Sequence, residues 1–78
     1  MNKQAGPGDG LQDHAGVGRR LSEARRAVGL SQTEVGHRLD VPQSRVAKLE
    51  TGDRRLQYLE AFAYAALYEV EPGFFQPD

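Results

Sequence analysis

The sequence predicts an all-α fold, a compact bundle of four to five helices that follows a disordered N-terminal tail. Three observations predict it. Apolar residues recur at helical spacing in successive segments, one segment opens with a helix-capping pattern, and glycine or proline separates neighbouring segments. The chain has 78 residues, close to the smallest size at which one hydrophobic core suffices. We therefore expect the helices to pack as one domain.

The N-terminal tail is expected to comprise residues 1–12, and the folded domain residues 13–78. Residues 1–12 are rich in glycine and have hardly any apolar side chains. Burial therefore cannot repay the conformational entropy that this segment would lose on ordering.

The first helix is expected to begin between residues 13 and 17 and to run to Val28. Its apolar stripe, at the i, i+4, i+7, i+11 spacing of one buried face, consists of Val17, Leu21, Ala24 and Val28. Gly29 follows the last apolar residue and suits the left-handed position that ends a helix. The helix also carries Arg19, Arg20, Arg25 and Arg26. Apart from Arg25, these arginines are interpreted as a solvated face.

The middle of the chain is interpreted as two short helices joined by a tight turn. Ser31 and Glu34 have the spacing of a capping box, in which each side chain accepts a hydrogen bond from the backbone N–H of the other residue. The first of these two helices therefore begins at Gln32. Val35 and Leu39 follow at i, i+4 spacing, so they share its buried face.

The second of these helices is expected from Pro42 to Glu50. Proline disfavours the α conformation in the residue before it, here Val41, and fits the first turn of a new helix. Val46 and Leu49, at i, i+3 spacing, are expected to point inward. The opposite, exposed face would then carry Gln43, Ser44, Ala47 and Lys48.

A last long helix is expected from Leu56 to Tyr68, after a loop at residues 53–55. Its predicted buried face consists of Leu56, Leu59, Phe62, Ala63, Ala66 and Leu67. The tyrosines of this helix would then lie at its edges, where aromatic side chains left over after core closure often mark a subunit interface. We therefore expect a dimer interface formed by Tyr64, Tyr68, Phe74 and Phe75.

Charge is unevenly distributed along the chain. The formal net charge is −1, but residues 19–55 carry nine Lys or Arg and five acidic residues, whereas residues 56–78 carry four acidic residues and no basic ones. A local positive block matters more for binding an anionic partner than the sum over the whole chain. The positive block coincides with the two short helices.

Several functional classes find no support in the sequence. There is no cysteine, no apolar run of membrane-spanning length and no signal-peptide pattern, so we expect a cytoplasmic protein without a membrane partner. No nucleophile–base pair or glycine-rich phosphate loop occurs, and His14 and His37 have no partner at metal-ligand spacing. We therefore expect neither an enzyme nor a metal, cofactor or small-molecule site.

The order of features in the two short helices resembles the helix-turn-helix of the phage repressor and Cro family, also called the xenobiotic-response-element (XRE) family of bacterial regulators. The motif would span Gln32 to Thr51, with Gly36, Val46 and Leu49 at its packing positions. At the turn, where the family usually has glycine, this chain has Asp40. Aspartate tolerates the left-handed conformation better than most residues, so the turn can be kept.

The resemblance covers residues 17–75 and implies a fold of the lambda-repressor type, ending in a short helix with Pro72 in its first turn. It implies a sequence-specific regulator of double-stranded DNA, expected to be a repressor, that reads the major groove with helix 42–50. Within this class the sequence does not distinguish a phage-type repressor, an antitoxin and a restriction-modification controller. It also implies a buried ion pair between Arg25 and Glu50. The Gln32 side chain is implied to contact a phosphate and to brace Gln43.

The residue types on the exposed face suit base edges in the major groove. An amide can bond adenine through both of its ends, a hydroxyl can serve either base, a methyl group can touch thymine, and an ammonium can reach guanine. The expected base contacts are Gln43, Ser44, Ala47 and Lys48. The expected phosphate contacts are Gln32, Arg45, Thr51, Arg54 and Arg55.

One recognition helix reads few base pairs, so a homodimer on a roughly palindromic operator is expected. The alternative is a protein-interaction module that keeps this fold without binding DNA. Acidic or bulky apolar residues at positions 43, 44 and 48 would favour that alternative, and the chain has none there.

Overall fold

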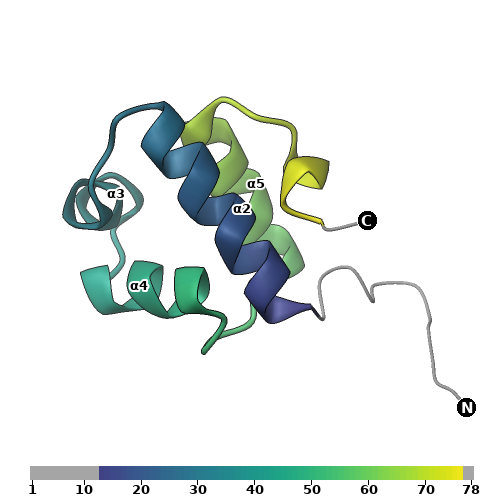
Figure 1. The fold of residues 1–78 in the computed structure, drawn as a ribbon. Helices are drawn as coiled ribbons and strands as arrows, with labels where there is room; N and C mark the ends of the chain where they lie inside the picture. The colour runs from purple at the N-terminus through teal and green to yellow at the C-terminus, as the bar shows by residue number, and fades with distance from the viewer. Residues whose placement is uncertain (1–12, 77–78) are drawn as a thin grey trace, which may run out of the picture.

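The computed structural model describes residues 13–76 of the chain. This part contains four α-helices and a short 3-10 helix, joined by short loops (Figure 1). In order they are α2 (His14–Ala27), α3 (Gln32–Leu39), α4 (Gln43–Thr51), α5 (Tyr58–Tyr68) and η1 (Pro72–Phe75). The predicted all-α fold is confirmed. The expected tail, residues 1–12, lies outside the described residues. None of the helices within residues 13–76 has the length and apolar character that a membrane span requires.

α2 begins and ends close to the predicted positions. The Asp13 carboxylate caps the helix by accepting a hydrogen bond from the Gly16 N–H at 3.1 Å. At the other end, Gly29 adopts a left-handed conformation with φ 75°, and its N–H donates to the Arg26 carbonyl at 3.0 Å. The chain can therefore reverse direction at once and enter α3.

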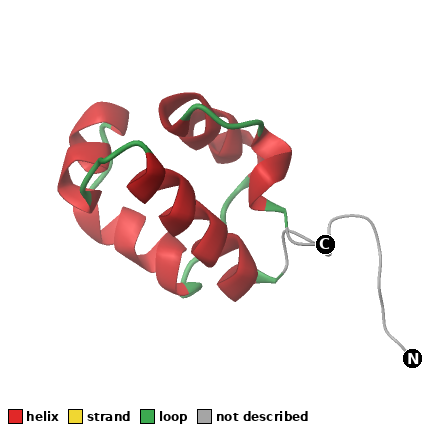
Figure 2. Cartoon of the chain, turned by 45° about the horizontal axis from the view of Figure 1, so that its top comes forward, coloured by secondary structure: helices red, strands yellow, loops and turns green. Residues whose placement is uncertain are grey.

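α2 occupies the middle of the molecule, with α4 packed along one side and α5 running behind it (Figures 1 and 2). The contact with α4 is made backbone to backbone at Gly18. A Cβ atom at this position would clash with the carbonyl oxygen of Glu50 and lie 2.7 Å from that of Leu49. Glycine is therefore required here for close packing, a role that the sequence did not reveal.

The hydrophobic core lies between α2, α4 and α5, and α3 and η1 complete it. Its buried residues are Val17, Leu21, Ala24, Val35, Val46, Leu49, Leu56, Ala61, Tyr64, Ala65, Tyr68 and Phe75. The inward positions predicted for the first three helices are thus confirmed, except that Val28 and Leu39 are only half-buried.

The prediction for α5 was wrong in the face that it buries. The buried residues of this helix are Ala61, Tyr64, Ala65 and Tyr68. Four residues predicted to be buried are exposed: Leu59, Phe62, Ala63 and Ala66. Leu67 is half-buried and packs at the edge of the core.

The error arises from the start of α5, which lies at Tyr58 and not at Leu56. Leu56 is buried, but it precedes the helix in a non-helical segment, so its side chain does not share the helical phase. Glu60 caps the helix by accepting from the Gln57 N–H at 2.8 Å. Counting the periodicity from Leu56 therefore rotated the predicted buried face away from the real one.

The C-terminal end of the domain is closed by aromatic side chains. Tyr68 makes edge-to-face contacts with Tyr64, at 6.0 Å between ring centroids, and with Phe75, at 6.3 Å. Burial raises the pKa of both tyrosines. η1 begins with Pro72, as predicted, and seats Phe75 in the core with no exposed surface. These rings hold η1 against α5.

Candidate nucleic-acid interface

The turn between α3 and α4 has the geometry that the sequence predicted. Ser31 and Glu34 form the capping box, with hydrogen bonds of 2.8 and 3.0 Å. Asp40 adopts the left-handed conformation with φ 58°, and the Val41 N–H donates to the Gly36 carbonyl at 2.9 Å. A Cβ atom at Gly36 would lie 2.7 Å from the Val41 carbonyl oxygen. The small residue is therefore needed beside the turn, which sets the angle between the two helices.

α4 presents the polar face that its sequence predicted. It starts at Gln43, one residue later than expected, because Pro42 is the residue that precedes the helix and not its first residue. Val46 and Leu49 are buried, whereas Gln43, Ser44 and Lys48 are exposed and Ala47 is half-buried. Three long or polar side chains and one methyl group thus project from one side of α4.

Arg25 of α2 and Glu50 of α4 form a largely buried ion pair. The Arg25 Nε atom lies 2.6 Å from Glu50 Oε2, and its Nη2 atom lies 3.0 Å from Oε1. The remaining guanidinium nitrogen donates to the Leu30 carbonyl at 2.8 Å. Only 11% of the Arg25 side chain and 7% of the Glu50 side chain are exposed. The hydrogen bonds to Glu50 raise the pKa of Arg25, so its guanidinium stays charged.

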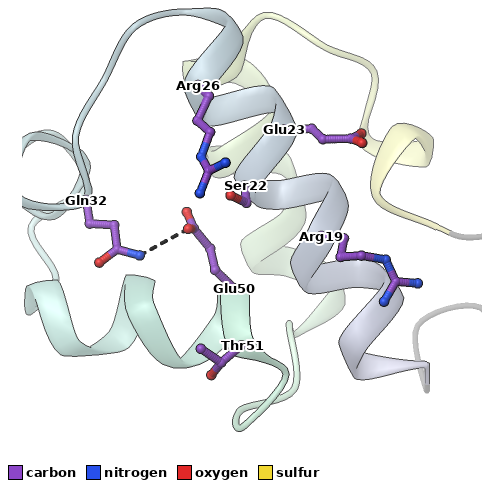
Figure 3. Close-up of a pocket in the computed structure, with 7 residues that line it drawn as sticks. All are labelled: Arg19, Ser22, Glu23, Arg26, Gln32, Glu50 and Thr51. Carbon is purple, nitrogen blue, oxygen red and sulfur yellow. Dashed lines mark hydrogen bonds between the residues drawn. The ribbon is translucent and has the colours of Figure 1, made fainter.

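A chain of hydrogen bonds continues from this ion pair to the exposed face of α4. Glu50 Oε1 accepts from the Gln32 side-chain amide at 3.0 Å, a contact drawn in Figure 3. Gln32 Oε1 accepts in turn from Gln43 Nε2 at 2.7 Å. We call Arg25, Glu50, Gln32 and Gln43 the polar relay. It connects the buried ion pair to the first residue of α4.

Two of the expected phosphate contacts share an acidic partner that the sequence analysis missed. Glu60, in the first turn of α5, lies 3.1 Å from Arg54 Nη1 and 3.6 Å from Arg45 Nη1. In the described part of the chain, Arg55 has no ion-pair partner and is exposed. The Thr51 hydroxyl donates to the Lys48 carbonyl or to Asp53 Oδ2. Arg55 is therefore the least engaged of these cations.

An open groove of about 520 Å³ lies beside the polar relay, between α2 and the α3–α4 motif. It is lined by Arg19, Ser22, Glu23, Arg26, Gln32, Glu50 and Thr51 (Figure 3). Arg26 projects from α2 toward Glu50 and Gln32 in this view. The groove thus places two arginines of α2 next to an expected phosphate contact.

Three of the four expected dimer residues are not available on the surface. Tyr64, Tyr68 and Phe75 are buried in the core, and Phe74 is half-buried beneath Arg20, whose guanidinium lies 5.6 Å from the ring centroid. Among residues 13–76, the exposed large apolar residues are instead Tyr58, Leu59 and Phe62, with 66%, 81% and 51% of their surface accessible. We call these three residues the α5 apolar face. The buried face of α5 was predicted in the wrong helical phase. The prediction therefore assigned core residues of this helix to the surface and surface residues to the core.

Comparison with known proteins agrees with the motif. A helix-turn-helix family model matches residues 21–75. The fold is similar to that of the restriction-modification controller protein C.AhdI from Aeromonas hydrophila, with 30% sequence identity and a TM-score of 0.75. The match covers 82% of this chain and 97% of that one. The comparison with curated proteins gave no match. The protein therefore belongs to the Cro/C1-type (XRE) helix-turn-helix family of DNA-binding transcription regulators.

Proposed function

We propose that the protein recognises a specific double-stranded DNA sequence by inserting α4 into the major groove. The observation that supports this most directly is the polar face of α4, in which Gln43 is exposed yet held by Gln32 at 2.7 Å. A side chain held before binding loses less conformational entropy on binding. The base contacts in this proposal are Gln43, Ser44, Ala47 and Lys48.

The backbone contacts are assigned to Gln32, Arg45, Thr51, Arg54 and Arg55. Gln32 lies in the first turn of α3, where backbone N–H groups and the helix dipole favour a phosphate. Glu60 pairs with both Arg45 and Arg54, so its carboxylate already neutralises part of the positive charge that these two arginines offer to a phosphate. Arg55 has no such compensation and is expected to contribute most to non-specific affinity.

A homodimer on a roughly palindromic operator completes this proposal. Two recognition helices related by a two-fold axis read half-sites about one helical turn, ~34 Å, apart. The α5 apolar face supplies the dimer contact, because three neighbouring apolar side chains on one helix favour a self-complementary interface. A small pocket between α5 and η1 adjoins this face and is lined in part by Tyr58, Phe62 and Pro72.

Repression of transcription is the proposed role, through occupation of an operator that overlaps a promoter. The control of a restriction-modification system, which is the role of the Aeromonas hydrophila protein, would use the same DNA-binding face. A reporter gene placed behind the selected operator, with and without the protein, tests repression directly.

The experiment that tests recognition compares a base contact with a phosphate contact. The operator is first selected from a random DNA pool. Gln43→Ala is expected to cost about 1–3 kcal/mol on the operator and to relax preference at one or two positions, with little change on random DNA. Arg55→Ala is expected to weaken both equally and to lower the slope of log K against log salt by about 1.

A second candidate function is a protein-interaction module, which the α5 apolar face favours because its three exposed apolar side chains could contact a different protein. The same experiment separates the two. If Gln43→Ala and Lys48→Ala are folded and bind every DNA like the parent, the polar face of α4 does not recognise DNA. The interaction module is then the better description.

A further inference from the structure

The polar relay has a direction that is set by its buried end. Glu50 is ionised beside Arg25, and a carboxylate can only accept hydrogen bonds. Gln32 must therefore turn its NH₂ group toward Glu50, which leaves its oxygen to face Gln43. Gln43 must in turn use an N–H to bond Gln32. Each amide orientation thus follows from the one before it.

This direction decides what Gln43 presents to DNA. One N–H of its amide is occupied by Gln32, so one N–H and the oxygen Oε1 remain. Adenine offers an acceptor, N7, beside a donor, N6–H, whereas guanine offers two acceptors, N7 and O6. The remaining donor and acceptor of Gln43 match adenine. Against guanine, the Gln43 oxygen would face another acceptor.

We propose that Glu50 is a positioning residue that makes Gln43 select adenine over guanine, acting through Gln32. This inference rests on the proposed function, since it requires Gln43 to contact a base. It assigns the buried ion pair a role beyond stability. The charge of Glu50 determines which bases the exposed end of the relay accepts.

The test uses the ratio of two affinities, for operators with adenine or guanine at the position that Gln43 reads. That position is the one at which Gln43→Ala loses its preference in selection from random DNA. A ratio is insensitive to stability, because only folded protein binds either operator. It therefore reports the orientation of Gln43 and not the fraction of folded protein.

Glu50→Gln is expected to lower the adenine-to-guanine ratio at least about five-fold, the lower limit for one bidentate base contact. Arg25 Nε makes the shorter contact, 2.6 Å, with Oε2, so the single oxygen of the new amide is expected at that position. Its NH₂ group then takes the Oε1 position, where it gives up the bond from Arg25 Nη2, faces Gln32 and reverses the relay. Gln43 would then present two donors, which suit guanine. Glu23→Gln is the matched control, because Glu23 lines the same groove but is not part of the relay. Its ratio is expected to equal that of the parent.

The double variant Gln32→Glu/Glu50→Gln moves the carboxylate one step along the relay without changing the net charge. Glu at position 32 accepts from Gln43, and Gln at position 50 donates to it and accepts from Arg25. The original direction is restored, so the ratio is expected to recover to that of the parent even if overall affinity falls. A purely structural role of Glu50 would not produce this recovery.

The proposal is overturned if Glu50→Gln keeps a ratio within about two-fold of the parent while Gln43→Ala abolishes the preference. It is also overturned if the double variant stays as unselective as Glu50→Gln. If Glu50→Gln does not fold, Gln32→Ala takes its place, because it interrupts the relay and leaves the ion pair intact. An unchanged adenine-to-guanine ratio in Gln32→Ala also overturns the proposal. Failure of the proposed function looks different, because Gln43→Ala would then alter no position of the operator.

Discussion

At the scale of single residues, the ion pair between Arg25 and Glu50 serves two parts of the molecule. It joins α2 to the end of α4, and through Gln32 it reaches Gln43 on the surface. Because most of both side chains is buried, neither charge can be solvated if its partner is removed. Stability and the proposed recognition of DNA would therefore depend on the same carboxylate.

Glu50→Ala is expected to lower the free energy of unfolding by about 3–5 kcal/mol, because it leaves the Arg25 charge buried without its partner. Denaturant unfolding followed by circular dichroism measures the change. Glu23→Ala, which removes an exposed carboxylate from α2, serves as the control and should stay within about 0.5 kcal/mol of the parent. A melting temperature within about 2 °C of the parent for Glu50→Ala would mean that the pair contributes little.

Tyr64→Phe and Tyr68→Phe are expected to leave stability unchanged or to raise it by about 1 kcal/mol. Within residues 13–76, both hydroxyl groups are buried and neither has a hydrogen-bond partner. Removing the hydroxyl keeps the aromatic packing and removes a polar group that burial has desolvated. Thermal unfolding of each variant checks this. A loss of more than about 1 kcal/mol would reveal a hydrogen bond, for example to an internal water molecule.

At the scale of helices, glycine allows the backbones of α2 and α4 to approach closely beside the core that their side chains share. Gly18 allows the α2 backbone to approach the carbonyl groups at the end of α4. Gly52 makes a second close approach at the start of α2, where a Cβ atom would lie 3.1 Å from the backbone of Ala15. Together they bring Glu50 within reach of Arg25.

Gly18→Ala tests this contact because two effects oppose each other. In an isolated helix, alanine is more favourable than glycine by about 1 kcal/mol. Here its Cβ atom would meet backbone oxygens that cannot move independently, and overpacking of this kind typically costs about 1–3 kcal/mol. We expect net destabilisation in denaturant unfolding.

Gly73→Ala is the control, because within residues 13–76 no atom outside its immediate chain neighbours lies within 4 Å of the position that its Cβ would occupy. It should change stability by no more than about 0.5 kcal/mol. If Gly18→Ala were as stable as Gly73→Ala, the helices could separate without cost and the close approach would not be required.

At the scale of the whole molecule, the protein has two distinct surfaces that lie on different helices. The polar face of α4 and the polar relay form one, and the α5 apolar face forms the other. Glu60 lies between them, since it is in the first turn of α5 and pairs with Arg45 of α4 and with Arg54 of the loop that follows α4. A dimer built through α5 would therefore hold two α4 helices in a fixed relative orientation.

Leu59→Glu combined with Phe62→Glu is expected to convert the dimer to monomers. Each substitution removes an apolar side chain that typically contributes about 2 kcal/mol or more at the centre of an interface. Each also places a negative charge on both sides of the two-fold axis. Both side chains are largely exposed, so the fold should persist. Sedimentation equilibrium measures the association.

Binding to a full operator should weaken in this double variant, whereas binding to a single half-site should not. His37→Glu, an exposed change on α3, is the control and should remain dimeric. A parent protein that sediments as a monomer on one asymmetric half-site would contradict the dimer altogether.

The sequence alone determined the features that depend on neighbours along the chain. The capping box of Ser31 and Glu34, the turn at Asp40 and the inward positions Val46 and Leu49 are local, because a cap or a helical face involves residues only three or four positions apart. For this reason the direction of the polar side chains on α4 could be predicted.

The tertiary structure alone decided the features that depend on how distant segments meet. The phase of α5 is set by the packing of Tyr64 and Tyr68 against α2 and η1, and no pattern within the helix distinguishes its two apolar faces. The required glycine at position 18 and the pairing of Glu60 with Arg45 likewise involve backbones or charges from different helices. Such contacts depend on the three-dimensional arrangement. Many residues of suitable type could pair with each partner, and only the fold determines which of them lies close.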